Sequence, residues 1–496
     1  MVQPVDWMAI AAPLILAGVA VLVLLVDAFA PPGAGRARLT ARPGAPREVP
    51  VAAVLTVVGV LGAAVPAALS WDQRRGTFCV PHGPCSFVLD RFTLVFWSVV
   101  LFGTLVVALM QTAAPKAATP PGEWNFLLLC SATGALTIAA SRDLVTLVVS
   151  LEVVSLPAFA MVGLRRGIPG AAEAALKFFL VSVVSTAVML MGVSLLYGAT
   201  GSVYLRGISS GITSGGPLQR VALVGALLAI VGLAFKVAAV PFHMWVPDTY
   251  VGAPVAVAAY LSVVSKSAGF VGLMLLLGFG LPTLAGVWAP VLAVLAALTM
   301  TVGNVIALRQ QHAVRLLAWS SVAQAGYILV PFGAVASGRA AFGASIGYLA
   351  IYAVMNLGAF AVAGVVGSRR PTQRIADYAG LVHEKPLVGW ALAFALVALA
   401  GLPPGILGLF AKVVVFDAAA GPVTWLAVVM AVNVAIGLVY YVRWLVELFR
   451  PSYDGESFTT PRGAGLAVLL TFVAGIVLSV LPGLLLDPFT TVLAQR

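Results

Sequence analysis

Residues 231–270 read VGLAFKVAAVPFHMWVPDTYVGAPVAVAAYLSVVSKSAGF, an apolar stretch that contains two lysines, three prolines and one histidine. Lys236 lies about fifteen residues into an apolar run, and Lys266 comes twelve residues after Pro254. At ~1.5 Å per residue, both lysines would lie deep inside bilayer-sized helices. Pro241 cannot donate a hydrogen bond to the carbonyl four residues back, which predicts a helix break close to Lys236.

Lysines in hydrocarbon are rare because each costs at least ~2.5–3.5 kcal/mol on insertion scales. One reading is that both side chains extend their ammonium groups to the membrane interface. The other reading is that they mark an ion path, a partner or a switch. Two lysines at mid-span, one of them beside a break, favour the functional reading.

The composition excludes a soluble protein. Of 496 residues, 61% are hydrophobic and 9% are charged, and the mean hydropathy is +1.07. The net charge of +11 is scattered through short loops, so it orients the chain in a membrane and gives no indication of nucleic-acid binding. The first apolar run is longer than the core of a signal peptide and lacks a basic region before it, so we read it as the first membrane span.

We therefore predict an all-α polytopic membrane protein formed by one integral membrane domain, residues 1–496. The apolar runs indicate about fourteen spans, near residues 8–30, 50–70, 87–110, 124–140, 143–163, 172–200, 218–243, 254–280, 283–308, 312–335, 339–367, 387–418, 423–449 and 465–490. Sixteen basic loop residues fall on one side of this topology and eight on the other, which places both termini outside.

Lysine and arginine are used differently along the chain. Lys177, Lys236, Lys266 and Lys412 fall inside apolar spans, whereas every arginine falls in a loop or near a span end. A buried lysine can lose its proton, whereas arginine stays protonated. The choice of lysine inside the membrane therefore suggests groups that exchange protons.

Glu152 is the acidic residue nearest the middle of a predicted span, and Lys236 is its candidate partner. Such a pair can act as a switch or be a static structural ion pair. Lys177 follows Glu173 by one turn, so a surface pair is nearly as plausible there as a secondary proton path. His243 could relay protons toward Lys266, or it could be a solvated loop residue.

A second break is predicted at residues 401–405, where Pro403 and Pro404 interrupt an apolar run two turns before Lys412. If residues 124–280 and 283–449 are two five-helix repeats, both breaks fall on the fourth helix of a repeat, the seventh and twelfth spans. These two spans run in opposite directions, which is the pattern of inverted repeats in transporters.

The three cysteines do not indicate a redox or metal centre. Cys79 and Cys85 lie in a loop assigned to the outside and could form a disulfide, and Cys130 lies in a span. With one histidine between the pair, the set is too poor for a zinc or iron-sulfur site.

The segment from Lys236 to Lys266 resembles the signature of the subunit N family of proton-pumping NADH-quinone oxidoreductase, respiratory complex I. The resemblance covers roughly residues 120–450. It is carried by Pro241-Phe242-His243, Trp245, Pro247-Asp248, Tyr250, Gly252-Ala253-Pro254, Leu261-Ser262, Leu316 to Ser321, Ala325-Gly326-Tyr327, Tyr352, Met355 to Phe360 and Asp377 to Leu381.

This resemblance implies an antiporter-like, proton-translocating subunit in the bacterial inner (plasma) membrane, with two inverted five-helix repeats and a central polar axis. By motif match, Glu152 resembles the family's carboxylate on the fifth helix, Lys236 its paired lysine, Lys266 the central lysine, Lys412 the terminal lysine, and Lys177 a further basic position. The resemblance implies no cofactor in this chain, with FMN, iron-sulfur clusters and quinone in partner subunits. The partners would be the other membrane-arm subunits and lipid.

Two positions depart from the family pattern. Gln324 stands where the family often has a histidine, so a titratable relay there is in doubt. The run from Pro403 to Lys412 is one residue longer than usual, which would rotate Lys412 by ~100° unless the break absorbs the extra residue.

Three alternatives compete with this interpretation. A subunit of a multi-subunit cation/proton antiporter or of a membrane-bound hydrogenase shares the lysine layout, although the sequence Tyr250 to Pro254 argues against it. A self-contained solute transporter would need a substrate pocket, and the sequence offers only protonatable groups. A structural scaffold would leave Lys236 and Lys266 without a role.

Overall fold

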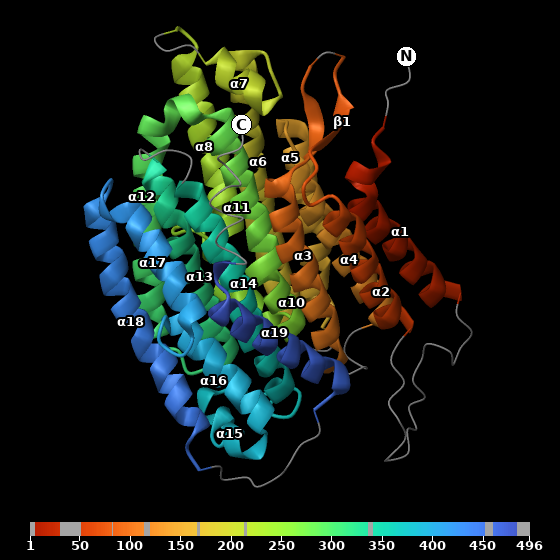
Figure 1. Cartoon of the computed structure of the whole chain (residues 1–496), viewed down its shortest axis with the longest axis vertical. Coiled ribbons are helices and arrows are strands. Elements are labelled where there is room, and N and C mark those ends of the chain that lie inside the picture. Colours follow the sequence, from red (N-terminus) through yellow and green to blue (C-terminus); the bar gives the residue numbers. More distant parts are fainter. Residues whose placement is uncertain are drawn as a thin grey trace.

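The computed structural model describes residues 5–29, 51–81, 83–113, 120–165, 169–212, 216–335, 341–451 and 460–483. Long helices run side by side through the molecule, with α1 and α2 at one edge and α18 at the other (Figure 1). Among the described residues, thirteen helices are long and apolar enough to cross a membrane. The predicted all-α membrane fold is therefore confirmed.

The first nine of these spans lie within or close to the predicted runs. They are α1 (Trp7–Phe29), α2 (Val51–Leu69), α3 (Arg91–Met110), α4 (Pro121–Ala140), α5 (Leu144–Gly163), α6 (Pro169–Thr200), α8 (Gln219–Val237), the continuous segment Val255–Gly280, and α12 (Ala285–Ala307). The segment Val255–Gly280 contains α10 (Val255–Tyr260), a π-helical turn (Leu261–Ser265), α11 (Lys266–Leu275) and a second π-helical turn (Leu276–Gly280).

The remaining spans are α13 (Ala313–Gly333), α14 (Ala341–Gly367), α18 (Thr424–Leu448) and α19 (Arg462–Val480). The predicted twelfth span consists of two helices, α16 (Pro386–Ala400) and α17 (Ile406–Ala420), of 15 residues each. Each half is about 22 Å long at ~1.5 Å per residue, too short to cross ~30 Å of hydrocarbon alone. The last predicted span, 465–490, ends at Val480, and its residues 484–490 lie outside the described residues.

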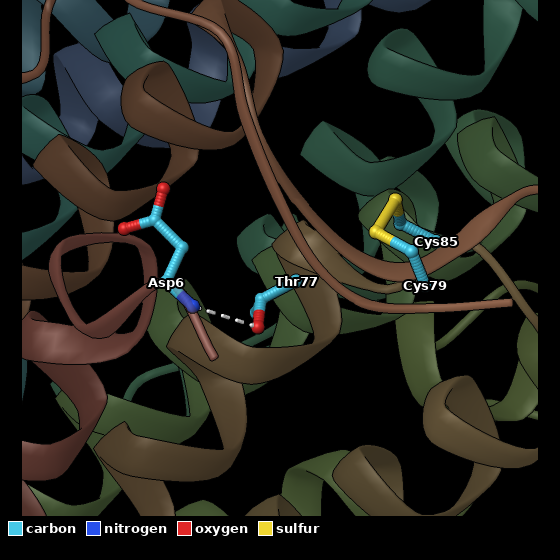
Figure 2. The surroundings of a disulfide bond; sticks show 4 residues. All are labelled: Asp6, Thr77, Cys79 and Cys85. Atoms are coloured by element: carbon cyan, nitrogen blue, oxygen red, sulfur yellow. Dashed lines mark hydrogen bonds between the residues drawn. A yellow bond between two sulfur atoms is a disulfide. The ribbon is translucent and has the colours of Figure 1, made fainter. Parts of the chain in front are cut away.

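The third span starts at Arg91, four residues later than predicted, because a short hairpin precedes it. Strands β1 (Arg75–Cys79) and β2 (Cys85–Leu89) pair antiparallel. Cys79 and Cys85 form a disulfide across the hairpin, and Thr77 accepts a hydrogen bond from the backbone N–H of Asp6 at 3.2 Å (Figure 2). The possible disulfide is thus present, and it ties the hairpin closed next to the start of α1.

Asp90 ends the hairpin and begins α3. Its side chain accepts a hydrogen bond from the Thr93 N–H, and its carboxylate lies 2.7 Å from the Arg142 guanidinium. Burial would raise the pKa of the Asp90 carboxyl, but Arg142 and the Thr93 amide hold that pKa below its ordinary value. This ionised cap fixes where the apolar helix begins.

The hairpin and the short helix α7 (Leu205–Gly211) lie at one end of the bundle, and α15 (Leu381–Glu384) lies at the opposite end (Figure 1). The predicted orientation requires more basic residues at the α15 end, and the loop before α15 carries Arg369, Arg370 and Arg374.

Both predicted breaks are present. Helix α8 stops at Val237, six residues before the predicted end of that span, and the short helix α9 (Trp245–Gly252) follows. Ala238 has a φ of 63° and Gly401 a φ of 82°, so each preceding helix ends in a left-handed residue. The Val240 N–H, freed by the first break, donates to Thr299 Oγ1 of α12 at 2.9 Å.

The centre of the bundle is formed by the segment Val255–Gly280 and by α14. In the most apolar stretch of each, 94% of the residues are buried. Each proposed five-helix repeat therefore contributes one almost completely buried segment to the centre, and each carries one broken fourth helix. The inverted relation between residues 124–280 and 283–449 stays a prediction.

Candidate functional site

Lys236 lies in the last turn of α8, directly before the first break, and only 6% of the residue is exposed. Its Nζ donates to Ser155 Oγ of α5 at 2.7 Å and to Ser182 Oγ of α6 at 3.0 Å. Glu152 Oε1 lies 3.7 Å from the same Nζ. The predicted partner is therefore present as an ion pair, while the shorter contacts of the ammonium group go to neutral hydroxyls.

Glu152 is less enclosed than its partner, since 29% of its side chain is exposed. Thr186 Oγ1 of α6 donates to Glu152 Oε1 at 2.7 Å. The carboxylate thus has a neutral donor of its own and a cation at longer range. Such a pair can lose or gain charge without leaving either partner unsolvated.

Close packing holds this site together. A Cβ on Gly269 would lie 3.0 Å from Lys236 Cβ, so the glycine lets α11 approach α8 at the lysine. Two helices of the same predicted repeat, α5 and α6, provide the polar atoms around Lys236 of α8. The site is therefore built by helix packing at mid-span.

Lys266 is the first residue of α11 and follows the π-helical turn at once; it is 1% exposed. Its Nζ donates to the Ser321 carbonyl of α13 at 2.5 Å and to Ser321 Oγ at 3.0 Å. Among the described residues Lys266 forms no ion pair. This lysine therefore joins the two predicted repeats through neutral oxygens.

Two buried polar atoms near Lys266, His243 Nδ1 and Asn356 Oδ1, have no hydrogen-bond partner in the described structure. The hydroxyls of Tyr250 and Tyr352 lie beside Ser321, the residue that binds Lys266. Asn356 also donates to Ser262 Oγ at 2.7 Å, one turn before Lys266. Polar atoms with unused lone pairs are the partners that buried water requires, so the surroundings of Lys266 suit proton exchange.

The solvated-loop reading of His243 is wrong. The residue is 5% exposed, and its ring packs against Trp319 with 5.4 Å between centroids. The compact turn between α8 and α9 buries the imidazole, which the sequence alone could not distinguish from a surface loop. Pro241, the residue that breaks the helix, lies two positions before it.

Lys412 lies on α17, after the second break, and is 7% exposed. Its Nζ donates to the carbonyls of Leu399 and Ala400 at 2.8 and 2.6 Å. These carbonyls end α16, where the break at Pro403 and Pro404 leaves them without helical donors. The ammonium group therefore caps the end of α16. Lys412 is buried even though the run from Pro403 to Lys412 is one residue longer than the family pattern.

Lys177 lies apart from the buried lysines. Half of its side chain, 51%, is exposed, and its Nζ lies 2.7 Å from Glu173 and 3.3 Å from Asp248. Asp248, on α9, also lies 3.2 Å from Arg315 of α13. Lys177 thus takes part in a surface ion-pair cluster, and the structure does not bring it to Lys236.

Sequence reasoning missed the hydroxyl partners Ser155, Ser182 and Thr186, and it missed Tyr441 of α18. A helical-period signal was available for the first three. Ser155 follows Glu152 by three residues, and Ser182 and Thr186 are four apart, so each pair shares one helix face. Tyr441 gave no such signal because its partners lie on other helices.

Among known protein families, the one described as "NADH:quinone oxidoreductase/Mrp antiporter, TM" matches residues 141–438 of this chain. NADH-quinone oxidoreductase subunit N 2 of Streptomyces griseus subsp. griseus is 50% identical over 97% of this chain and 92% of its own length.

Among solved structures, a chain of respiratory complex I from Thermus thermophilus with bound aureothin superposes with a TM-score of 0.77 at 30% identity, over 96% of this chain and 98% of that one. A chain of the Mrp complex from Dietzia sp. DQ12-45-1b gives a TM-score of 0.84 at 22% identity, over 99% and 97%. The latter similarity concerns the fold alone.

Proposed function

Because the chain belongs to the subunit N family of NADH-quinone oxidoreductase, whose members are antiporter-like proton-translocating membrane subunits, we propose that Glu152, Lys236, Lys266 and Lys412 carry its protons. The observation that supports this proposal most is the burial of three lysines at mid-span, each with its own kind of oxygen partner. Fixed structural cations would be better served by arginine.

The pair of Lys236 and Glu152 is the input of the proposed path. When the carboxylate lies close, it stabilises the ammonium form of Lys236; when the pair separates, desolvation favours the neutral amine. Ser155 and Ser182 accept hydrogen bonds from the ammonium in one state and can donate one to the amine in the other. The pair therefore releases a proton toward Lys266 as the charges separate.

Lys266 and Lys412 receive protons in turn. Both are held by neutral oxygens, so neither is locked in its charged form by a carboxylate. In this proposal the chain performs no redox chemistry, and FMN, iron-sulfur clusters and quinone belong to partner subunits of the same enzyme. The other membrane-arm subunits transmit the driving force to the Glu152 and Lys236 pair.

The test uses the intact membrane complex, purified in mild detergent through a tag on this chain. We expect flavin, iron-sulfur signals and NADH-quinone reductase activity to co-purify. We then expect Lys266→Ala complexes, reconstituted in vesicles, to lose most NADH-driven proton pumping. The matched control is Lys177→Ala, which removes an exposed lysine. Pumping that is equal in the two variants would contradict the proposal.

A cation/proton antiporter subunit is the second candidate, supported by the family description and by the fold of the Mrp complex chain. It predicts that the chain co-purifies with membrane partners alone, without flavin. It also predicts that Lys236→Ala and Lys266→Ala abolish sodium-driven pH changes in vesicles. Co-purification of redox activity would rule it out.

A further inference from the structure

A set of hydrogen bonds centred on Ser320 and Gln324 of α13 reaches Lys412 at one end, and its other end lies one residue along the chain from Ser321, which binds Lys266. Lys266 ends on Ser321, and the adjacent Ser320 Oγ lies 2.5 Å from the hydroxyl of Tyr441 on α18. One turn later, Gln324 Nε2 donates to the same Tyr441 hydroxyl at 3.1 Å. Ser320 and Gln324 are four residues apart, so one hydroxyl reaches both.

Gln324 carries this set onward to the second break. Its Nε2 also donates to the Leu399 carbonyl at 3.5 Å, the same oxygen that accepts from Lys412 Nζ at 2.8 Å. Its Oε1 accepts from Tyr348 OH at 2.6 Å. The amide is thus held at both ends, and an amide has no readily titrating group at neutral pH.

Of the two adjacent tyrosines on α18, Tyr441 is the one whose hydroxyl contacts Ser320 and Gln324. Both residues are buried, at 2% and 1% exposure. The hydroxyl of Tyr440 donates to Asn304 Oδ1 of α12 at 2.9 Å, away from Ser320 and Gln324. Tyr440 packs against Tyr441 with 4.4 Å between ring centroids, and it is a control of equal size and burial with a different polar partner.

Building on the proposed function, we infer that Tyr441 is a positioning residue for proton transfer between Lys266 and Lys412. Its hydroxyl orients the Gln324 amide, so that one N–H faces the Leu399 carbonyl and competes with Lys412 for that oxygen. The competition keeps Lys412 from being held too tightly by the end of α16. Without the Tyr441 hydroxyl, Gln324 loses an acceptor and can turn away from Leu399.

The experiment compares Tyr441→Phe with Tyr440→Phe in the purified, reconstituted complex. Two rates are measured on equal amounts of assembled complex: NADH-quinone reduction and proton uptake. We expect Tyr441→Phe to lower the protons moved per NADH, with proton transfer slowed roughly 2- to 12-fold, the range that the net worth of one hydrogen bond converts to. Tyr440→Phe should keep the wild-type ratio.

Ser320→Ala and Gln324→Leu test the same link from either side. Ser320→Ala removes the other partner of the Tyr441 hydroxyl with a very small change in volume, so it remains informative if Tyr441→Phe fails to assemble. Gln324→Leu combined with Tyr441→Phe should be no worse than the more severe single variant, because both act through one amide. Additive losses would overturn the inference.

Lys266→Ala and Lys412→Ala test the proposed function separately from the inference about Tyr441. If both lysine variants pump normally, the proposed function itself fails. If both lose pumping while Tyr441→Phe keeps the wild-type proton ratio, the inference about Tyr441 alone is wrong. A loss of equal size in Tyr440→Phe would also overturn it, because the effect would then reflect any buried hydroxyl on α18.

Discussion

The two broken helices hold their lysines in opposite ways. At the first break Lys236 precedes the interruption and binds side chains from α5 and α6, including the carboxylate of Glu152. At the second break Lys412 follows the interruption and binds carbonyls of its own broken helix. A lysine held by a neighbour's charge responds when that neighbour moves. A lysine held by backbone responds only when its own helix does.

The largest effect is expected at the first break. Lys236→Ala removes the ammonium group that Ser155, Ser182 and Glu152 share, so the proposed path loses its first proton carrier. We expect NADH-driven proton uptake, followed with a pH-sensitive dye in vesicles, to fall at least ~10-fold, or ~1.4 kcal/mol. Lys236→Arg controls for charge and should assemble but pump poorly. Near-normal pumping in either variant would remove the first break from the path.

Lys412 distinguishes capping from proton exchange at the second break. Lys412→Arg can still donate to the Leu399 and Ala400 carbonyls but cannot give up its proton. We expect normal thermal stability with a several-fold loss of pumping. Lys412→Ala should lose stability as well, by roughly 1–3 kcal/mol, because the Ala400 carbonyl loses its donor and the Leu399 carbonyl keeps only the longer bond from Gln324. Full pumping by the arginine variant would make Lys412 a helix cap only.

Glu152→Gln tests whether the first break depends on charge. The amide keeps its size and the hydrogen bond from Thr186. A pair at 3.7 Å with a partly exposed carboxylate is worth roughly 1 kcal/mol after screening, so we expect pumping to fall about 5-fold. Thr186→Val is the control, since it removes the neutral partner alone. A wild-type rate in Glu152→Gln would show the ion pair to be static.

The left-handed residues at the two helix ends offer a reciprocal pair of variants. Gly401→Ala places a methyl group at a φ of 82° and 2.9 Å from Lys412 Cδ. The strain should destabilise the folded state by ~1–2 kcal/mol and so lower the unfolding temperature. Ala238→Gly relieves a φ of 63° and should be neutral or stabilising. Fluorescence-detected thermal unfolding in detergent compares them. The opposite ranking would contradict the backbone argument.

The smallest effect is expected at Lys177. Its ammonium group is half exposed and forms surface ion pairs, which are worth little. Lys177→Ala should change proton uptake by less than about twofold. A loss comparable to that of Lys236→Ala would restore Lys177 to a secondary proton path.

Local signals in the sequence account for most of the fold. Apolar run length predicted the spans, and Pro241, Pro403 and Pro404 predicted both interruptions, because a missing N–H breaks a helix wherever it occurs. The pairing of Glu152 with Lys236 followed from the cost of an isolated charge in hydrocarbon. These properties belong to single positions and need no knowledge of packing.

The details that depend on helix rotation were not predictable. Helices that are apolar on all sides carry no stripe to show which face is inward. The spacing of Ser182 and Thr186 shows that they share a helix face, but neither their contact with Lys236 and Glu152 nor the contacts of Tyr441 could be assigned. The π-helical turn before Lys266 has no proline or glycine to mark it. The hairpin that delays α3 was hidden by its apolar residues, which read as the continuation of a span.

The hydrogen bond from Val240 to Thr299 bears on how the chain is made. Thr299 lies 59 residues later, on the first helix of the second proposed repeat. An amide left without an acceptor in hydrocarbon costs several kcal/mol. During synthesis, the first break therefore remains incomplete until α12 enters the membrane. A chain stopped at Gly280 would lack Thr299, so we expect the first five-helix unit to be less stable alone than in the full chain.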